Sequence, residues 1–230
     1  IESVLNQSCQ NFEIIIVDNG SSDKTEEMVT HLAANGSGAD MLYIKLLRNC
    51  GGDFARNIGA LHSRGQLIVF TDDDCIVPAD WLFEFGQEFK ADPKLDGVGG
   101  FKLPRSREER PDIYHRFLMW GHFLQKHVRT KDNASPNRCG FLNANVCYRK
   151  EIFEKIGGFN TYFKHIGSRE FKARLHKAGA GLLYVPRMVE HRAKFTLASH
   201  ITKLFPQGWD WHLLHTLHPD IYGSPSLLYF

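Results

Sequence analysis

Three consecutive aspartates carry the strongest chemical signal in the sequence. Asp72, Asp73 and Asp74 come directly after the apolar run 67–70, which is typical of a buried strand. Side chains alternate along an extended segment, so we expect Asp72 and Asp74 to point to one side and Asp73 to the other. Two carboxylates on one side suit a hard divalent ion that shares phosphate oxygens with a nucleotide. The alternative, one helix cap and two solvated acids, leaves a cluster of three acids unexplained.

Other polar side chains could bind a nucleotide or complete a metal site. Asp18 and Asn19 follow a β-branched run and could hydrogen-bond a base and ribose, although such residues also form ordinary turns. Arg56 comes early in a helix predicted after two glycines, and it could meet a nucleotide or lie on the surface. His191 could be a further metal ligand or a structural histidine, and the pattern leaves both roles open.

The order of the predicted elements would bring these residues to one place. Strands are expected at 12–17, 41–47 and 67–70, each followed by a helix. Three strand-helix units with short connections predict an α/β, Rossmann-like fold with a mostly parallel central sheet and helices on both faces. Ligands gather at the carboxyl ends of such strands, where the segments beginning at Asp18 and Thr71 should lie.

The second half of the chain is less regular. We expect a strand at 98–103, a long helix at 111–129, a loop at 131–138, a helix at about 168–178, a strand at 182–185 and an irregular tail. The length of 230 residues suits one domain. We divide this domain into a nucleotide-binding half at 1–95, a half at 96–200 that would bind the second substrate, and a C-terminal extension at 201–230, because nothing after residue 95 resembles a phosphate cradle.

Composition argues against several classes of protein. A formal net charge of +2 provides no strong field for nucleic acid. Five cysteines without a C-x-x-C pair disfavour a disulfide framework or a zinc site and favour a reducing, cytoplasmic setting. No stretch reaches the roughly 18 apolar residues of a spanning helix, so we expect any membrane association to be peripheral, at the inner face. A dehydrogenase is disfavoured because no G-x-G-x-x-G follows the first strand.

Several short segments, in this order and spacing, resemble glycosyltransferase family 2. They are residues 3–7, 12–25, 48–51, 55–59, 70–74 and 156–159, and Arg174-Leu175 with Ala178-Gly179. The resemblance implies the GT-A fold, a nucleotide-diphosphate sugar as donor and inversion at the anomeric carbon, in the setting of polysaccharide biosynthesis and the cell envelope. Members usually begin with a strand before the helix that contains Ser3, so we expect this strand to be missing from the sequence.

The resemblance also implies roles for particular residues. Asp72 and Asp74 form a D-x-D group that holds Mn²⁺ or Mg²⁺ on the diphosphate, and His191 resembles the histidine that completes this site in some members. The residues expected to contact the nucleotide sugar are Asp18, Asn19, Arg56, Asp72, Asp73 and Asn145. UDP-sugars are our first expectation for the donor, followed by dTDP- and GDP-sugars, and the acceptor would be a glycan, a lipid-linked sugar or a protein.

The usual catalytic base is replaced in this chain. Members typically carry Glu-Asp seven and six residues before the arginine that matches Arg174, and these positions are Gly167 and Ser168. A serine hydroxyl is a poor base near neutral pH, and general-base catalysis contributes about 10²–10⁴-fold. Glu170 would face about 200° away around a helix, and His165 has a suitable ordinary pKa of about 6.5. We therefore expect slow or absent transfer, and a higher rate in Ser168→Asp.

Two alternatives to an active transferase stay open. The sequence at residues 167–168 would suit a pseudo-glycosyltransferase that binds a nucleotide sugar without turning it over. A nucleotidyltransferase also places an acidic metal site at a sheet edge, but it would normally need a glycine-rich basic loop near its first strand. Slow turnover would indicate an active transferase, whereas stoichiometric binding without turnover would indicate the pseudo-glycosyltransferase. Release of pyrophosphate from a nucleoside triphosphate would identify the nucleotidyltransferase.

Overall fold

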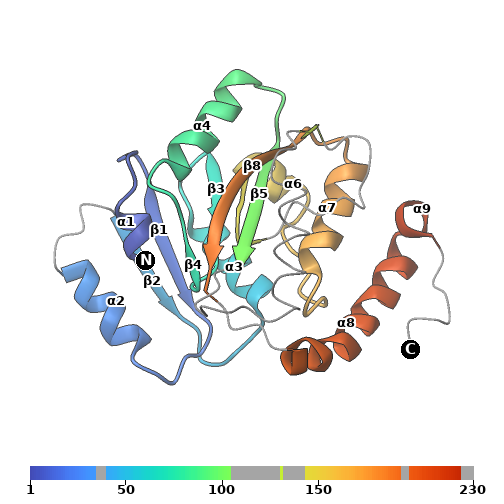
Figure 1. Ribbon diagram of the computed structural model, residues 1–230, viewed down its shortest axis with the longest axis horizontal. Helices are drawn as coiled ribbons and strands as arrows, with labels where there is room; N and C mark the ends of the chain where they lie inside the picture. The colour runs from blue at the N-terminus through green and yellow to red at the C-terminus, as the bar shows by residue number, and fades with distance from the viewer. Residues whose placement is uncertain (35–39, 105–129, 132–142, 193–196, 224–230) are drawn as a thin grey trace.

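The computed structural model describes residues 1–34, 40–104, 130–131, 143–192 and 197–223 (Figure 1). The first half contains α1 (Glu2–Leu5), β1 (Glu13–Asp18), α2 (Thr25–Ala34), β2 (Asp40–Lys45), α3 (Gly52–His62), β3 (Leu67–Phe70), β4 (Cys75–Ile76) and α4 (Trp81–Ala91). The second half contains β5 (Gly97–Pro104), β6 (Thr130–Lys131), β7 (Val146–Arg149), α6 (Lys150–Lys155), α7 (Gly167–Lys177), β8 (Leu182–His191), α8 (Leu197–Leu217) and α9 (Pro219–Tyr222). The helix expected at 111–129, and the loop expected at 131–138 beyond its first residue, lie outside the described residues.

The strands form two sheets. β1 and β2 pair in parallel, and a six-stranded sheet has the order β3-β7-β5-β8-β4, with β6 paired to β8. The α/β class is confirmed, but the expected predominance of parallel strands is wrong for the larger sheet. Only β5 and β8 run parallel there, and its other pairs are antiparallel. Strands that are connected by a helix, as β1 and β2 are by α2, can pair in parallel. The strands of the second half do not belong to this strand-helix repeat.

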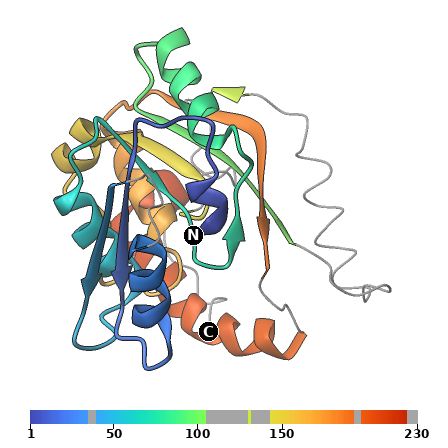
Figure 2. The ribbon, with the colours of Figure 1, turned by 90° about the vertical axis from the view of Figure 1, so that its left-hand side faces the viewer.

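Helices cover both faces of the larger sheet. Val146 and Tyr148 of β7 belong to one core with residues of α3, α6 and α7, whereas Cys147 belongs to another with α4. This division follows from the alternation of side chains along a strand, and it explains why β7 is buried on both faces. In Figure 1 the β1-β2 pair lies at the left and α8 at the lower right, with the larger sheet between them, and Figure 2 shows α8 at the bottom of the molecule.

Aromatic side chains fill the core beside α7. Phe171 meets the Tyr148 ring edge to face at 5.2 Å, and Phe153 meets Phe159 at the same centroid distance. All four side chains are at most 3% exposed. Burial of each such ring contributes roughly 1.5–3 kcal/mol, so this cluster fixes α7 and the segment before it against the sheet.

β8 is longer than the sequence predicted. The expected strand ended at residue 185, next to Pro186, but β8 continues to His191 and pairs with β5 up to Pro104. The register of this pairing shifts between Gly99 and Phe101, opposite the segment that contains Pro186. Proline is tolerated at such irregularities, so the strand continues beyond it. His191 therefore lies at the end of a strand and not in a later loop.

The predicted irregular tail is also corrected. Residues 197–217 form the helix α8, and Leu214 packs fully buried against Phe163 and Ile166 from the segment before α7. Within the described residues, none of the helices combines the length and apolar character needed to cross a bilayer. The four described cysteines, Cys9, Cys50, Cys75 and Cys147, are free thiols.

Candidate functional site

The acidic segment connects two strands of the larger sheet. β3 ends at Phe70 and β4 begins at Cys75, so the aspartates lie in the short link between them. β4 pairs antiparallel with β8, with Cys75 opposite His191, and the Arg192 N–H donates to the Asp74 carbonyl over 2.8 Å. This strand register brings the end of β8 beside the aspartates that follow β3.

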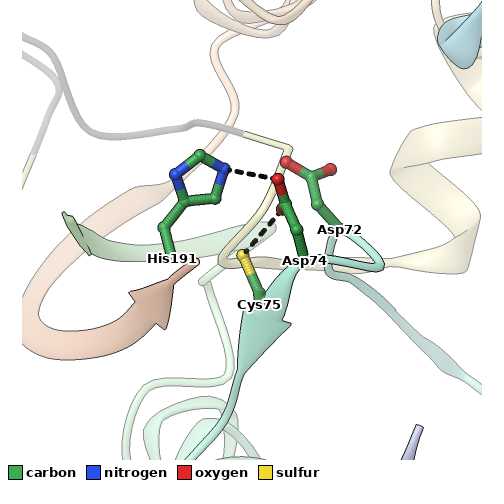
Figure 3. Close-up of side chains that lie close together, drawn as sticks. All are labelled: Asp72, Asp74, Cys75 and His191. Carbon is green, nitrogen blue, oxygen red and sulfur yellow. Dashed lines mark hydrogen bonds and ion pairs between the residues drawn. The ribbon is translucent and has the colours of Figure 1, made fainter. Parts of the chain in front are cut away.

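One possible ligand atom from each of four side chains lies within 4.8 Å of the others. These side chains are Asp72, Asp74, Cys75 and His191 (Figure 3). His191 Nε2 is 3.0 Å from Asp74 Oδ2, and Cys75 Sγ is 3.8 Å from Asp74 Oδ1. Asp73 is exposed and is not in this group. Two carboxylates and an imidazole form a suitable donor set for Mn²⁺, and carboxylates alone would also suit Mg²⁺.

Two cations from separate elements flank Asp72. Arg56 Nη2 of α3 donates to Asp72 Oδ1 over 2.8 Å, and Lys102 Nζ of β5 lies 3.4 Å from Oδ2. Burial acts to raise the pKa of Asp72, but the charges and hydrogen bonds of Arg56 and Lys102 outweigh it and lower this pKa below its usual value. Asp72 is therefore ionised at neutral pH, as a metal-binding carboxylate must be.

His191 is buried, with 5% of its surface exposed. Burial lowers the pKa of His191, and the nearby charge of Lys102 lowers it further, whereas Asp74 and Asp72 oppose the shift. The imidazole is consequently neutral near pH 7, which is the form that binds metal ions. Burial together with the charge of Asp72 raises the pKa of the Cys75 thiol to about 11, so this sulfur stays protonated and is the weaker donor of the group.

The loop after β1 is braced by its own polar groups. Asp18 is 4% exposed, and its carboxylate accepts hydrogen bonds from the Ser21 N–H over 2.7 Å and from the Tyr43 hydroxyl over 2.6 Å. Burial and the bond to Asp18 raise the pKa of Tyr43 to about 12, so the phenol stays a donor. Gly20 has φ +81°, and a Cβ there would lie 2.6 Å from the Arg48 carbonyl carbon, so only glycine fits this turn.

Asn19 extends this brace to the segment before α3. Its side-chain oxygen accepts from the Cys50 N–H over 2.8 Å, and its amide donates to Asn49 Oδ1 over 2.9 Å. The loops after β1 and β2 are therefore joined at the edge where a nucleotide was expected. In this arrangement the side chains of Asp18 and Asn19 stabilise the loops themselves. A contact to a base would have to use those atoms of the two residues that remain exposed.

Asn145 occupies a different place from the one expected. It is fully buried, its Oδ1 accepts from Trp81 Nε1 over 2.8 Å, and its amide donates to the carbonyls of Phe101 and Arg187 over 2.7 and 3.0 Å. With both ends of its amide bonded inside the protein, Asn145 ties β5, β8 and α4 together. We therefore leave it out of the donor site.

Two of the expected base positions have other surroundings. Glu170 is 2% exposed, and its two oxygens accept hydrogen bonds of 2.8 Å from Arg174, with His218 Nε2 3.3 Å away. It is held as a buried ion pair. His165 is exposed, and its backbone N–H donates to Asp210 Oδ2 over 2.7 Å. Ser168 is half-buried in the first turn of α7.

Sequence reasoning overlooked three residues near this site. Lys102 was read only as part of a strand, and Cys75 only as one of five cysteines. Asp53 was not considered, although Arg56 Nη1 donates to its Oδ1 over 2.9 Å, so that one guanidinium joins Asp53 to Asp72. The spacing of Asp53 and Arg56 on a predicted helix was a usable signal for their pairing.

Comparison with known proteins gives consistent matches. The family model described as glycosyl transferase family 2 matches residues 1–157. A glucosyl-dolichyl phosphate glucuronosyltransferase of Haloferax volcanii is 20% identical over 239 residues, covering 96% of this chain and 72% of that protein. Glycosyltransferase AglE of the same organism is 28% identical over 179 residues, and the match covers 75% of this chain and 54% of AglE.

Two solved structures have the same fold. Staphylococcus aureus TarS 1–349 in complex with UDP-GlcNAc aligns with a TM-score of 0.71 at 13% identity, covering 96% of this chain and 62% of that one. Mannosyltransferase PcManGT from Pyrobaculum calidifontis, in complex with GDP-Man and Mn²⁺, aligns with a TM-score of 0.70 at 18% identity, covering 97% and 60%. The chain thus spans about three fifths of these structures, and the likeness supports the GT-A fold.

Proposed function

The chain belongs to glycosyltransferase family 2, and on this basis we propose that it transfers a sugar from a nucleotide-diphosphate sugar to an acceptor hydroxyl with inversion at the anomeric carbon. The observation that carries the proposal is the meeting of Asp72, Asp74 and His191 at one sheet edge, with Arg56 and Lys102 beside them. Anionic ligands and cationic side chains together are what a metal-bound diphosphate needs.

Each of these residues has a part in the proposed reaction. Asp72, Asp74 and the neutral imidazole of His191 would hold Mn²⁺ or Mg²⁺, which when bound offsets negative charge on the leaving diphosphate. Arg56 and Lys102, which both lie within 3.4 Å of Asp72, would be the cations that contact phosphate oxygens. Departure of the nucleotide diphosphate then needs no proton from the protein.

We place the base and ribose of the donor near Asp18 and Asn19, and exposed Asp73 at the rim of the same site. UDP-sugars remain our first choice of donor, because TarS was solved with UDP-GlcNAc, and GDP-sugars follow, because PcManGT was solved with GDP-Man. A relative is named for glucosyl-dolichyl phosphate. We therefore favour a lipid-linked sugar as acceptor over a free glycan or a protein, with work at the inner face of a membrane.

Thermal stabilisation tests the donor site directly. UDP, dTDP, GDP and ADP are each added with and without Mn²⁺, and the melting temperature of the chain is measured. We expect one diphosphate to stabilise the fold only when Mn²⁺ is present, by about 2.7 kcal/mol at a free concentration 100-fold above its Kd. The variant Asp72→Asn should lose this effect.

The matched control is Asp40→Asn, which removes an exposed carboxylate paired with Arg64. Such exposed pairs contribute little to stability, so this variant should keep the Mn²⁺-dependent stabilisation. If none of the four diphosphates stabilises the wild-type chain, or if Asp72→Asn responds as the wild type does, the acidic cluster is structural and the proposal is wrong.

A further inference from the structure

Transfer of a sugar to a hydroxyl releases a proton, and a group near the donor site must accept it. Asp72 and Asp74 would bind the metal ion of the proposed site, and both oxygens of Glu170 accept hydrogen bonds from Arg174. Within the described residues, Asp53 is the carboxylate that lies one guanidinium away from Asp72 without being part of that cluster. Its surroundings therefore decide whether it could take the proton.

The two oxygens of Asp53 are in different situations. Oδ1 accepts hydrogen bonds from Arg56 Nη1 over 2.9 Å and from Asn143 Nδ2 over 3.0 Å. Oδ2 accepts none from the described residues, and the side chain as a whole is 10% exposed. One oxygen thus fixes the carboxylate, and the other is left with lone pairs for a further donor. This division is what a positioned base requires.

The start of α7 leaves room for this carboxylate. A Cβ built on Gly167 would lie only 1.8 Å from Asp53 Oδ2, so any larger residue would collide with it. Oδ2 therefore occupies the volume that a side chain at residue 167 would otherwise fill. The second oxygen of Asp53 is therefore directed at Gly167, the first residue of α7.

The charges around Asp53 favour proton uptake. Burial raises the pKa of Asp53 above its ordinary value, and the neighbouring charges of Asp72 and Glu170 raise it further, whereas Arg56 opposes them. Of these groups, Arg56 lies on α3, Glu170 on α7 and Asp72 in the link after β3. A carboxyl whose pKa moves toward the working pH is a better general base than an ordinary surface aspartate.

We propose that Asp53 is the general base of the transfer, an inference that rests on the proposed function. Asp53 Oδ2 takes the proton of the acceptor hydroxyl while the oxygen of that hydroxyl forms a bond to the anomeric carbon. The bond from that carbon to the phosphate oxygen breaks, and its electron pair leaves with the nucleotide diphosphate. The proton then passes from Asp53 to water, which restores the carboxylate.

The competing role for Asp53 is purely structural. A carboxylate in the first turn of α3 is favoured by the helix dipole, and it also orients Arg56. That role needs only Oδ1, which an amide oxygen can replace. Asp53→Asn therefore keeps the acceptor for Arg56 and Asn143 and removes the basic oxygen, so the variant separates the two roles.

The experiment measures release of nucleotide diphosphate from UDP-GlcNAc, or from GDP-mannose if GDP stabilises the chain better than UDP, with water as acceptor. We expect Asp53→Asn to lower kcat by about 10²–10⁴-fold. KM, and the diphosphate affinity obtained from the melting shift, should stay within about threefold of the wild-type values. The fall of kcat at acid pH in the wild type should disappear in this variant. Asp53→Ala, which opens a cavity beside Gly167, should recover part of its rate with added formate.

Each contrary result has a separate meaning. An unchanged kcat in Asp53→Asn, or equal losses of kcat and of diphosphate binding, would show that Asp53 only positions Arg56. If the wild-type chain binds a diphosphate with Mn²⁺ but releases none from the sugar donor, the proposal that Asp53 is the general base is wrong, whereas the proposed donor site is retained. A wild-type chain that binds no diphosphate would overturn both. Asp40→Asn serves as the carboxylate-to-amide control and should behave as the wild type.

Discussion

At the scale of single residues, Asp72 joins two parts of the chain through its charge. It pairs with Arg56 of α3 and Lys102 of β5, and its pKa in the folded state lies below the ordinary value of 3.8. The folded state then binds this proton less tightly than the unfolded state does. The contribution of Asp72 to stability is therefore present above pH 3.8 and is lost as the pH falls through the lowered pKa.

Substitution of Asp72 should reveal this dependence. In metal-free buffer at neutral pH, we expect Asp72→Asn to melt at a lower temperature than the wild type, because Arg56 and Lys102 both lose the charge of Asp72, although Arg56 keeps its pair with Asp53. The difference should shrink as the pH falls below about 4. Thermal melts of both proteins across the acid range provide the measurement, and a difference that stays constant with pH would contradict the assignment.

Gly167 allows a second residue-scale prediction, which concerns fit and not charge. Gly167→Ala places a methyl group 1.8 Å from Asp53 Oδ2, so we expect a loss of about 1–3 kcal/mol of unfolding free energy from overpacking. The same change in an Asp53→Ala background should cost much less, because the carboxylate is gone. Denaturant unfolding of the four proteins of this cycle measures the coupling.

Gly86 provides the control for that cycle. It also lies in a helix, but a Cβ there meets nothing within 4 Å. Gly86→Ala should therefore stabilise the chain by about 0.5–1 kcal/mol through helix propensity. If Gly167→Ala were also stabilising, the close approach of Asp53 to α7 would be incorrect.

At the scale of elements, α4 offers a matched pair of aromatic residues. Phe85 is 1% exposed and packs in the core with Trp81, whereas Phe83 on the same helix is 49% exposed. We expect Phe85→Ala to cost about 3–5 kcal/mol of unfolding free energy and Phe83→Ala less than about 0.5 kcal/mol, the usual effect of a surface change. Urea unfolding compares the two variants, and similar losses would mean that α4 is packed on a different face.

The elements also separate what the sequence could predict from what it could not. Local periodicity was sufficient for α2, α3 and α4 and for β1, β2 and β3, because each reflects a pattern close in sequence, whereas the short strand β4 was not predicted. The antiparallel pairing of β7 depends on partners far away in the chain, and no local pattern encodes it. The expected strand at 182–185 was too short, because β8 continues past a register shift in its pairing with β5 that lies opposite Pro186.

The sequence indicated part of the candidate cluster, and the role of this cluster as a metal site stays a prediction. Asp72, Asp74 and His191 were anticipated, and the structure places them within reach of one ion. The resemblance to the family implied that Asn145 contacts the nucleotide sugar, but its amide hydrogen-bonds buried backbone carbonyls. The position of Asp53 against Gly167 depends on the packing of α3 against α7, which sequence patterns do not specify.

At the scale of the whole molecule, one carboxylate fastens α8 to the loop before α7. Asp210 is 3% exposed, and its Oδ2 accepts from the backbone N–H groups of Lys164, His165 and Ile166 at 3.1, 2.7 and 3.4 Å. Hydrogen bonds to a charged group contribute about 1.5–3 kcal/mol. This contact links the last long helix to the segment that leads into Gly167.

Removal of that carboxylate should loosen the link. We expect Asp210→Ala to lower the unfolding free energy by about 1.5–3 kcal/mol and to speed amide hydrogen exchange at residues 164–166. Asp220→Asn is the control, because Asp220 forms an exposed pair with Lys177. If exchange at 164–166 were as slow in Asp210→Ala as in the wild type, α8 would not be what holds this loop.

The pairing of β4 with β8 has a consequence for how the chain folds. Asp72 and Asp74 come from the first half, but His191 reaches them only after the last strand has joined the sheet. Contacts between distant segments form slowly because a long loop must close first. The complete set of proposed metal ligands therefore cannot form in a nascent or partly folded first half. If the proposed site binds Mn²⁺, the onset of this binding during refolding would report when β8 joins the sheet.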